Sequence, residues 1–190
     1  MRKLFRYCLS AVVLLLVGTA PANAAESRAD VVIAVNELPR GLEPGEDHGN
    51  VDVRATYSIF DTLIRRDFSV AGGGNASLKP LLAESWKRVS PTILEVRLRK
   101  GVRFHNGDEL TADDVVFTFS PERLWGKDSV IVGGRQYFGH LKQVEKLDPY
   151  TVRFVTEAPD LMLEQRLAAY TAQVVNRRHW MSFQKADDKT

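Results

Sequence analysis

The stretch LAESWKRVSPTILEVRLRKGVRFHNGDELTADDVVFTF, from Leu82 to Phe119, decides the fold. Within it, Leu94, Val96 and Leu98 alternate with charged residues, which is the period-2 pattern of a strand with one buried face. Near the end of the stretch the apolar residues change to helical spacing. The pattern therefore predicts strands followed by a helix, joined by very short connections.

Three backbone signals place the turns of this stretch. Ser90-Pro91 marks a turn because proline disfavours the helical region for the residue before it, so Glu84–Val89 and Thr92–Arg99 are expected to pair as a hairpin. Asn106-Gly107 is the strongest short-range hairpin dipeptide. Gly101 is expected to adopt a positive φ, which glycine tolerates without steric cost.

The helix that follows has clear capping residues. Thr111 is expected to be its N-cap, with Asp113 and Asp114 in the first turn, where they face the positive end of the helix dipole. Asp114 occupies the N3 position of a near capping box. Val115 and Phe119 lie on the apolar face of this helix. A helix beginning at this threonine is therefore predicted.

Three pieces of this stretch, in their order and spacing, resemble the signature of the extracellular solute-binding proteins of family 5. This is the peptide and nickel group that serves ABC importers. The pieces are LAESW at 82–86, LRKGVRFHNG at 98–107 and LTADDVVF at 110–117. The Ser90-Pro91-Thr92 turn is shorter than the family's usual turn. Leu42-Glu43-Pro44 resembles the family's Leu-Asp-Pro loop with one conservative departure.

The resemblance implies an α/β fold of the periplasmic-binding-protein type, namely type II of the three-domain kind, in truncated form. The expected parts are a signal peptide at 1–24, the first segment of lobe I at 25–49, the small extra domain with β-hairpins and helices at 50–156, and the start of the return to lobe I at 157–190. An N-terminal fragment of this kind is expected to bind solute weakly, because one lobe buries little of a ligand's surface. It is also expected to expose apolar surface around Val31, Ile33 and Val35.

The function implied by the resemblance is solute binding without catalysis or a cofactor. The protein would capture a small molecule or oligopeptide, above all a peptide, and deliver it to the permease subunits of an ABC transporter. Relatives with this signature also carry nickel complexes, haem and oligosaccharides, so the signature does not name the solute. The implied ligand-binding residues are His48, Gly49 and Asn50, which follow the Leu-Glu-Pro loop. A backbone-rich segment there would pair with an extended peptide as an added strand.

The first 24 residues have the layout of a secretory signal peptide. Arg2, Lys3 and Arg6 form a positive n-region, and Leu9–Val17 is an apolar run too short to span a bilayer comfortably. Ala22-Asn23-Ala24 supplies a small-x-small cleavage site. We expect cleavage after Ala24 and a periplasmic protein that does not span the membrane. The alternative for this segment is an N-terminal membrane anchor.

Composition argues against several classes of protein. The 190 residues carry a formal charge of +2, and removing the three basic residues of the n-region leaves 23 basic against 24 acidic residues, or −1. This balance indicates no nucleic-acid partner. Cys8 is the only cysteine, so the cleaved chain would have no disulfide.

Outside the deciding stretch the expectations are more local. Asp30–Asn36 is an apolar run that predicts a strand buried on both faces. Val51–Arg65 predicts an amphipathic helix whose apolar face carries Val53, Tyr57, Phe60 and Ile64. Leu141–Leu147 and Thr151–Thr156 predict a second hairpin that turns at Asp148-Pro149.

The remaining signals lie between and after these elements. Gly133, Gly134 and Gly139 mark a loop. Asp160 is expected to cap a last short helix carrying Leu161, Leu163 and Leu167. Gln173–Asn176 is expected to begin a strand, and Gln184–Thr190 to be a polar tail.

Two alternative functions stay open at this stage, a secreted hydrolase and a stand-alone secreted interaction module without a transport role. A hydrolase needs a nucleophile or a metal cluster. His105, Asp108, Asp113 and Asp114 are close in sequence, but no second histidine lies four residues from His105, so turn and cap chemistry explains them better than zinc. The serines lack the Gly-x-Ser-x-Gly context of a hydrolase nucleophile.

Overall fold

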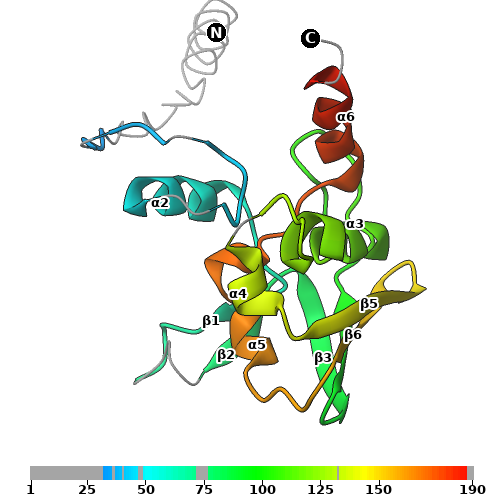
Figure 1. Cartoon of the computed structure of the whole chain (residues 1–190). Coiled ribbons are helices and arrows are strands. Elements are labelled where there is room, and N and C mark those ends of the chain that lie inside the picture. Colours follow the sequence, from blue (N-terminus) through cyan, green and yellow to red (C-terminus); the bar gives the residue numbers. More distant parts are fainter. Residues whose placement is uncertain are drawn as a thin grey trace, which may run out of the picture. The chain divides into compact units, whose positions relative to one another are not determined.

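The computed structural model of the chain describes residues 32–35, 37–39, 41–46, 49–71, 77–131 and 133–187, with side chains to residue 183 (Figure 1). The chain divides into two units, 1–34 and 35–190. In the first unit, the described residues 32–34 belong to no helix or strand. All helices and strands named below lie in the second unit.

The second unit alternates short helices and strands. In chain order they are α2 (Asn50–Ile59), β1 (Ile64–Arg66), β2 (Leu78–Pro80), β3 (Ala83–Ser90), β4 (Ile93–Leu98), α3 (Ala112–Thr118), the π-helical turn η1 (Pro121–Trp125), α4 (Gly134–Phe138), β5 (Leu141–Asp148), β6 (Thr151–Thr156), α5 (Leu163–Arg166), the 3₁₀ turn η2 (Tyr170–Ala172) and α6 (Arg177–Asp187).

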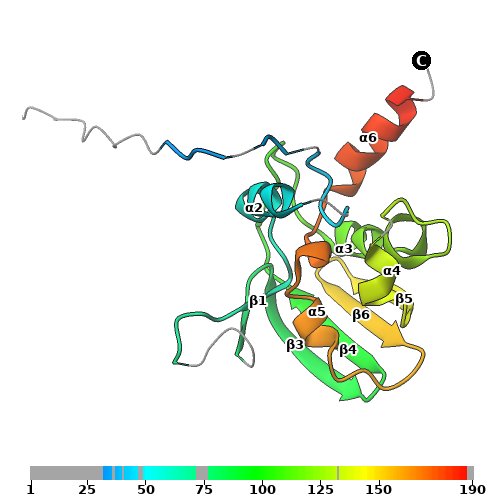
Figure 2. The same cartoon turned by 60° about the vertical axis from the view of Figure 1, so that its left-hand side comes forward.

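Both predicted hairpins are present and form one antiparallel sheet in the order β3-β4-β6-β5 (Figure 2). Val96 of β4 lies opposite Trp86 of β3 on one side and Val152 of β6 on the other. A separate two-stranded sheet pairs β1 with β2, with Arg65 opposite Lys79. The hairpins are local pairings across short turns, which is why the sequence pattern located them.

The core lies between α3 and the inner face of the four-stranded sheet. Phe119, just after α3, contacts Phe138 of α4 and Phe154 of β6 edge to face, with ring centroids 5.3 and 5.2 Å apart. Val96 and Val115 are fully buried in the same cluster. The alternation of Leu94, Val96 and Leu98 therefore marks the inner face, as predicted.

The capping prediction at the start of α3 is confirmed. Thr111 is the N-cap, and Oδ2 of Asp114 accepts hydrogen bonds from the Thr111 backbone N–H and hydroxyl, both at 3.0 Å. The other carboxylate oxygen of Asp114 accepts the backbone N–H of Arg177, also at 3.0 Å. One buried aspartate therefore connects the first turns of α3 and α6.

The predicted glycine turns are also confirmed. Gly101 has φ +74° and Gly107 has φ +88°. The Gly107 N–H donates to the carbonyl of Phe104 at 2.9 Å, and the Phe104 N–H donates to the carbonyl of Asp108 at 2.8 Å. Asn106 accepts the Asp108 N–H through its side chain at 3.1 Å, which closes the turn.

Gly107→Ala is expected to lower the free energy of unfolding by about 1 kcal/mol, because a Cβ is strained at this positive φ. An added Cβ would meet nothing within 4 Å, so the cost comes from the backbone alone. Gly133→Ala is the matched control: it has φ −75°, and its Cβ would make only an ordinary contact at 3.8 Å. Urea unfolding followed by circular dichroism compares the two, and equal midpoints would contradict the prediction.

The predicted strand at 30–36 is not present in the described part, residues 32–35. These residues belong to no strand, and Val32, Ile33 and Val35 expose 91, 76 and 49% of their surface. No strand among the described residues pairs with them, and an extended segment without a partner gains no ladder hydrogen bonds. The expected exposure of Ile33 and Val35 is confirmed, and Val31 lies outside the described residues.

Helix α2 differs from its prediction in length and in orientation. It ends at Ile59, and the last two residues expected in it, Ile64 and Arg65, belong to β1, which pairs with β2. Its buried positions are Asp52 and Thr56, whereas Tyr57 is 51% exposed. The four apolar residues at helical spacing therefore did not identify the buried face of α2. The last of them, Ile64, is buried, but it belongs to β1 and not to the helix.

Three further expectations are corrected. The glycine-marked loop contains helix α4, because Gly133 and Gly139 flank a run able to form one helical turn. Gln173 makes only an isolated bridge to Thr62 and begins no strand. The expected polar tail is helical to Asp187, within α6.

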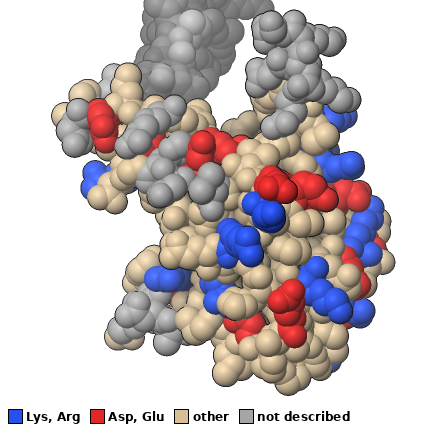
Figure 3. Space-filling view, viewed as in Figure 1, with Lys and Arg blue, Asp and Glu red and all other residues tan. Residues whose placement is uncertain are grey.

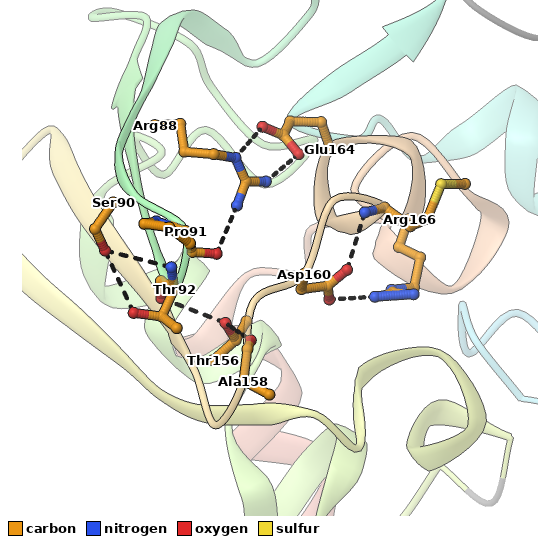
Figure 4. A network of polar contacts seen from close by, with 10 residues as sticks. Arg88, Ser90, Pro91, Thr92, Thr156, Ala158, Asp160, Glu164 and Arg166 are labelled. Atoms are coloured by element: carbon orange, nitrogen blue, oxygen red, sulfur yellow. Dashed lines mark hydrogen bonds and ion pairs between the residues drawn. The ribbon is translucent and has the colours of Figure 1, made fainter.

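Asp160 is not the N-cap of α5, because Met162 occupies that position; the contacts that Asp160 makes instead are shown in Figure 4. Its carboxylate accepts the backbone N–H of Met162 at 2.9 Å and pairs with Arg166, whereas α5 begins at Leu163. Beside it, Arg88 of β3 donates to Glu164 of α5 and so fastens the helix to the sheet (Figure 4).

Candidate functional site

The loop at 41–46 is held by a buried ionic anchor. The guanidinium of Arg123, 1% exposed, pairs with Glu43 and donates to the Pro44 and Thr118 carbonyls, each at 3.1 Å. The second Glu43 oxygen accepts the Trp180 indole N–H at 3.0 Å. Burial lowers the pKa of Arg123, and the charge of Glu43 opposes that shift. This anchor connects the Leu-Glu-Pro loop to η1 and α6.

The three residues expected to bind ligand follow this loop. His48 lies outside the described residues. Gly49 is half-buried and extended, with φ −70° and ψ 178°, and its carbonyl accepts the Val53 N–H at 3.2 Å. Asn50 is exposed and opens α2. Gly49 and Asn50 therefore lie at one end of α2, whose other end borders the pocket described next.

A pocket of about 1010 Å³ lies among α2, β1, α4 and η2. We call it the tyrosine pocket, and it is defined by Tyr57, Phe60, Arg65, Arg66, Tyr137 and Tyr170. The rings of Tyr137 and Tyr170 meet edge to face at 5.7 Å. Partial burial raises the pKa of Tyr57, against the opposing effect of the positive charge of Arg66. The size and the aromatic lining are typical of a ligand pocket.

The tyrosine pocket also has a charged rim. Lys79 lines it and donates to Asp67 at 2.8 Å. Hydrogen bonds from Lys79 and Ser69 hold the pKa of Asp67 well below its usual range. Asp61 lines the pocket as well, with an exposed side chain, while its backbone carbonyl accepts the Val174 N–H at 2.9 Å.

A second hollow, of about 680 Å³, lies beside α6. We call it the α6 groove, defined by Leu42, Phe60, Val102, Phe104, Trp180 and Phe183. Leu42 and Phe183 expose 52 and 60% of their surface. The groove is apolar, and the exposed His105 lies at its edge.

The acidic residues near His105 serve structure. Asp108 accepts hydrogen bonds from Asn106 and Asn176, at 2.9 and 3.0 Å, and pairs with Arg178. Partial burial raises the pKa of Asp108, but these three partners outweigh it and hold the pKa below its usual range. Asp113 pairs with Lys146 at 2.7 Å. Within the described ranges no three His, Cys, Asp or Glu side chains gather as metal ligands.

Arg97, the basic residue of β4, is exposed to solvent. Arg97 pairs with Glu84 at 3.2 Å, and Arg153 of β6 pairs with Glu95 at 2.7 Å. On the face shown in Figure 3, Lys and Arg lie among Asp and Glu rather than in a patch of one sign. Among the helices that the structure describes, none is both long and apolar enough to cross a membrane.

Sequence reasoning missed the anchor and the tyrosine pocket. Glu43 and Arg123 are 80 positions apart, and nothing local marks Arg123 as buried. Tyr137 and Tyr170 lie in separate short helices and meet only in the fold. The η1 sequence, PERLW, contains two charged residues, Glu122 and Arg123, so its composition does not single out the buried one.

Comparison with known proteins gives consistent matches. The sequence model described as bacterial extracellular solute-binding proteins, family 5 Middle, matches residues 77–190. The Di/tripeptide-binding protein 3 of Pseudomonas aeruginosa is 31% identical over 178 residues, which cover 84% of this chain and 32% of that protein. The chain thus spans about a third of the length of the curated relatives it matches first.

Solved structures agree with this result. The periplasmic binding protein DppA of Helicobacter pylori, in complex with the peptide STSA, aligns with a TM-score of 0.63 and 25% identity, covering 78% of this chain and 31% of that one. A dipeptide-binding protein of Pseudoalteromonas in complex with Met-Leu aligns with a TM-score of 0.66 at 22% identity, covering 78 and 32%, and supports the fold alone. The expected α/β fold of the periplasmic-binding-protein type is confirmed.

Proposed function

This chain belongs to the bacterial extracellular solute-binding proteins of family 5, and from that membership we propose that it takes part in binding a small solute of the peptide class. The observation that carries the proposal is the tyrosine pocket, a concave surface lined in part by aromatic rings, in a chain that has relatives named as peptide-binding proteins. Those relatives are binding proteins rather than enzymes, so the proposed role is capture without catalysis.

The proposed peptide site extends from the tyrosine pocket along α2. Tyr57, near the end of the helix, lines the pocket, while Gly49 and Asn50 lie at its start. In this proposal His48, Gly49 and Asn50 contact the peptide backbone, and the tyrosines contact its side chains. Because Tyr57 stays half exposed, the described residues form one wall of the site, and full burial of a ligand requires a second wall.

The transport role is part of the same proposal. The segment 1–24 is a signal peptide cleaved after Ala24, the mature protein is periplasmic, and it delivers its solute to the permease subunits of an ABC transporter. Residues 25–49 and 157–190 belong to lobe I, and 50–156 form the small extra domain. Binding is coupled to closure of two lobes around the ligand, as in hinged binding proteins.

Titration of the full-length chain with the peptide Ala-Phe-Ala, followed by backbone NMR, tests the proposal. We expect saturable shifts at Gly49, Asn50 and Tyr57 with a Kd between about 10 μM and about 1 mM, because one wall provides only part of the contacts. Tyr57→Ala should abolish the shifts. Phe183→Ala, which changes the α6 groove instead, should leave them unchanged.

Two results would contradict the proposal. The absence of saturable shifts at millimolar peptide would remove the binding role. A Kd below about 10 μM, roughly −7 kcal/mol, would show that the described residues form a complete site and not one wall.

A further inference from the structure

Two arginines of the tyrosine pocket have no acidic partner among the residues that the structure describes. Arg65 of β1 lies directly opposite Lys79 of β2, and like charges at such a cross-strand position destabilise a sheet. Lys79 is neutralised by Asp67 at 2.8 Å. Within the ranges that the structure describes, neither Arg65 nor its neighbour Arg66 forms an ion pair, and both are exposed and line the pocket.

The excess of positive charge lies beside aromatic rings. The pocket lining contains three cations, Arg65, Arg66 and Lys79, and one carboxylate, Asp61. Because Lys79 is already paired with Asp67, two positive charges, those of Arg65 and Arg66, face one negative charge, that of Asp61. Guanidinium groups bind carboxylates through two parallel hydrogen bonds, and the neighbouring rings offer surface to an apolar or aromatic side chain.

We infer that the tyrosine pocket is selective for peptides that carry a carboxylate next to an aromatic or apolar side chain, with Arg65 and Arg66 binding the carboxylate. The inference rests on the proposed function, because it names the class of peptide that the same site takes. The carboxylate comes either from the peptide C-terminus or from an acidic side chain, and both present the same group to a guanidinium.

Three related peptides separate these sources. Ala-Phe-Glu carries two carboxylates, Ala-Phe-Gln carries one, and amidated Ala-Phe-Gln carries none. Calorimetric titration of the full-length chain should give the tightest Kd for Ala-Phe-Glu and the weakest for the amide. If Kd differs only between Ala-Phe-Glu and Ala-Phe-Gln, the arginines bind an acidic side chain. If Kd differs only between Ala-Phe-Gln and its amide, the arginines bind the peptide C-terminus.

The variant Arg65→Gln/Arg66→Gln should weaken binding of Ala-Phe-Glu about tenfold, the product of two partly exposed ion pairs, and leave the amide unaffected. Arg65→Lys/Arg66→Lys keeps the charge and should recover part of the loss, which a role in folding alone would not predict. Arg97→Gln removes one positive charge on β4, away from the pocket, and should leave Kd unchanged. The preference for Ala-Phe-Glu over amidated Ala-Phe-Gln should fall when the ionic strength rises from about 0.01 M to about 0.15 M. Over this range the screening length falls from about 30 to about 8 Å, which weakens the attraction between guanidinium and carboxylate.

The failure of this inference differs from failure of the proposed function. If none of the three peptides binds, the proposed function is wrong and the inference with it. If all three bind equally and the Arg65→Gln/Arg66→Gln variant changes nothing, the inference is overturned and peptide binding stands. If Arg97→Gln weakens Ala-Phe-Glu as much as the double variant does, net charge explains the selectivity and the pocket assignment is overturned.

Discussion

Arg123→Met should lower the free energy of unfolding by about 3–5 kcal/mol, the range for removing one partner of a buried ion pair. The guanidinium of Arg123 is fully buried and serves three acceptors at once, the Glu43 carboxylate and the carbonyls of Pro44 and Thr118. Methionine fills much of the volume but donates no hydrogen bond. The Glu43 charge and two carbonyls then lose their donor in a site where water replaces it poorly.

Arg153→Met is the matched control for this loss. Arg153 pairs with Glu95 and Glu145, but its side chain is 34% exposed, so its removal should cost under about 1 kcal/mol. Chemical denaturation of both variants by intrinsic fluorescence measures the difference. Equal unfolding midpoints would show that the Arg123 anchor contributes no more than a surface ion pair.

A double variant separates charge from packing at the anchor. Glu43→Gln/Arg123→Met removes the carboxylate charge that the single Arg123→Met variant leaves unpaired. It should therefore be more stable than the sum of the two single losses predicts, a coupling that double-mutant cycles detect. Strict additivity would mean that Glu43 and Arg123 act independently.

The anchor illustrates what the sequence pattern could not predict. Leu42-Glu43-Pro44 was expected to be a loop because it resembles the family's Leu-Asp-Pro loop, and the structure agrees. The function of Glu43 depends on Arg123 and Trp180, which follow by 80 and 137 positions. Periodicity and turn chemistry concern neighbours in sequence, so they give no information about such a partner.

Where contacts are local, prediction worked well. The β3–β4 and β5–β6 hairpins, the Thr111 cap and the positive φ of Gly101 and Gly107 each depend on residues within a few positions. The prediction of the buried face of α2 failed because that face depends on contacts with distant residues. Its buried face is chosen by what packs against it, and the buried positions are polar, Asp52 and Thr56.

The candidate site follows the same division. Gly49 and Asn50 were reached through a loop resemblance, and they remain proposals at the start of α2. The tyrosine pocket gathers Tyr57, Tyr137 and Tyr170 from three separate elements, and no spacing in the sequence connects them. A pocket made of long-range contacts becomes visible only after the chain has folded.

Phe119→Ala should destabilise the fold by about 3–5 kcal/mol, the usual cost of deleting a buried aromatic ring and leaving a cavity. Phe119 is fully buried, and its ring contacts Phe138 and Phe154 edge to face, so one residue connects α3, α4 and β6. The alanine variant loses the ring's apolar burial and both aromatic contacts. A domain of ordinary stability, about 5–15 kcal/mol, would lose a large part of it.

Phe68→Ala is the control, because this phenylalanine is 78% exposed and its loss should change stability by less than about 0.5 kcal/mol. Thermal and urea unfolding of the two variants, followed by circular dichroism, give the comparison. Phe138→Ala adds a second test: because Phe119 and Phe138 touch, the double variant should lose less than the sum of the single losses. If Phe119→Ala unfolds at the same urea concentration as Phe68→Ala, then the aromatic cluster does not hold α3 against the sheet. The core must then be stabilised by the aliphatic residues of β4 and β6 alone.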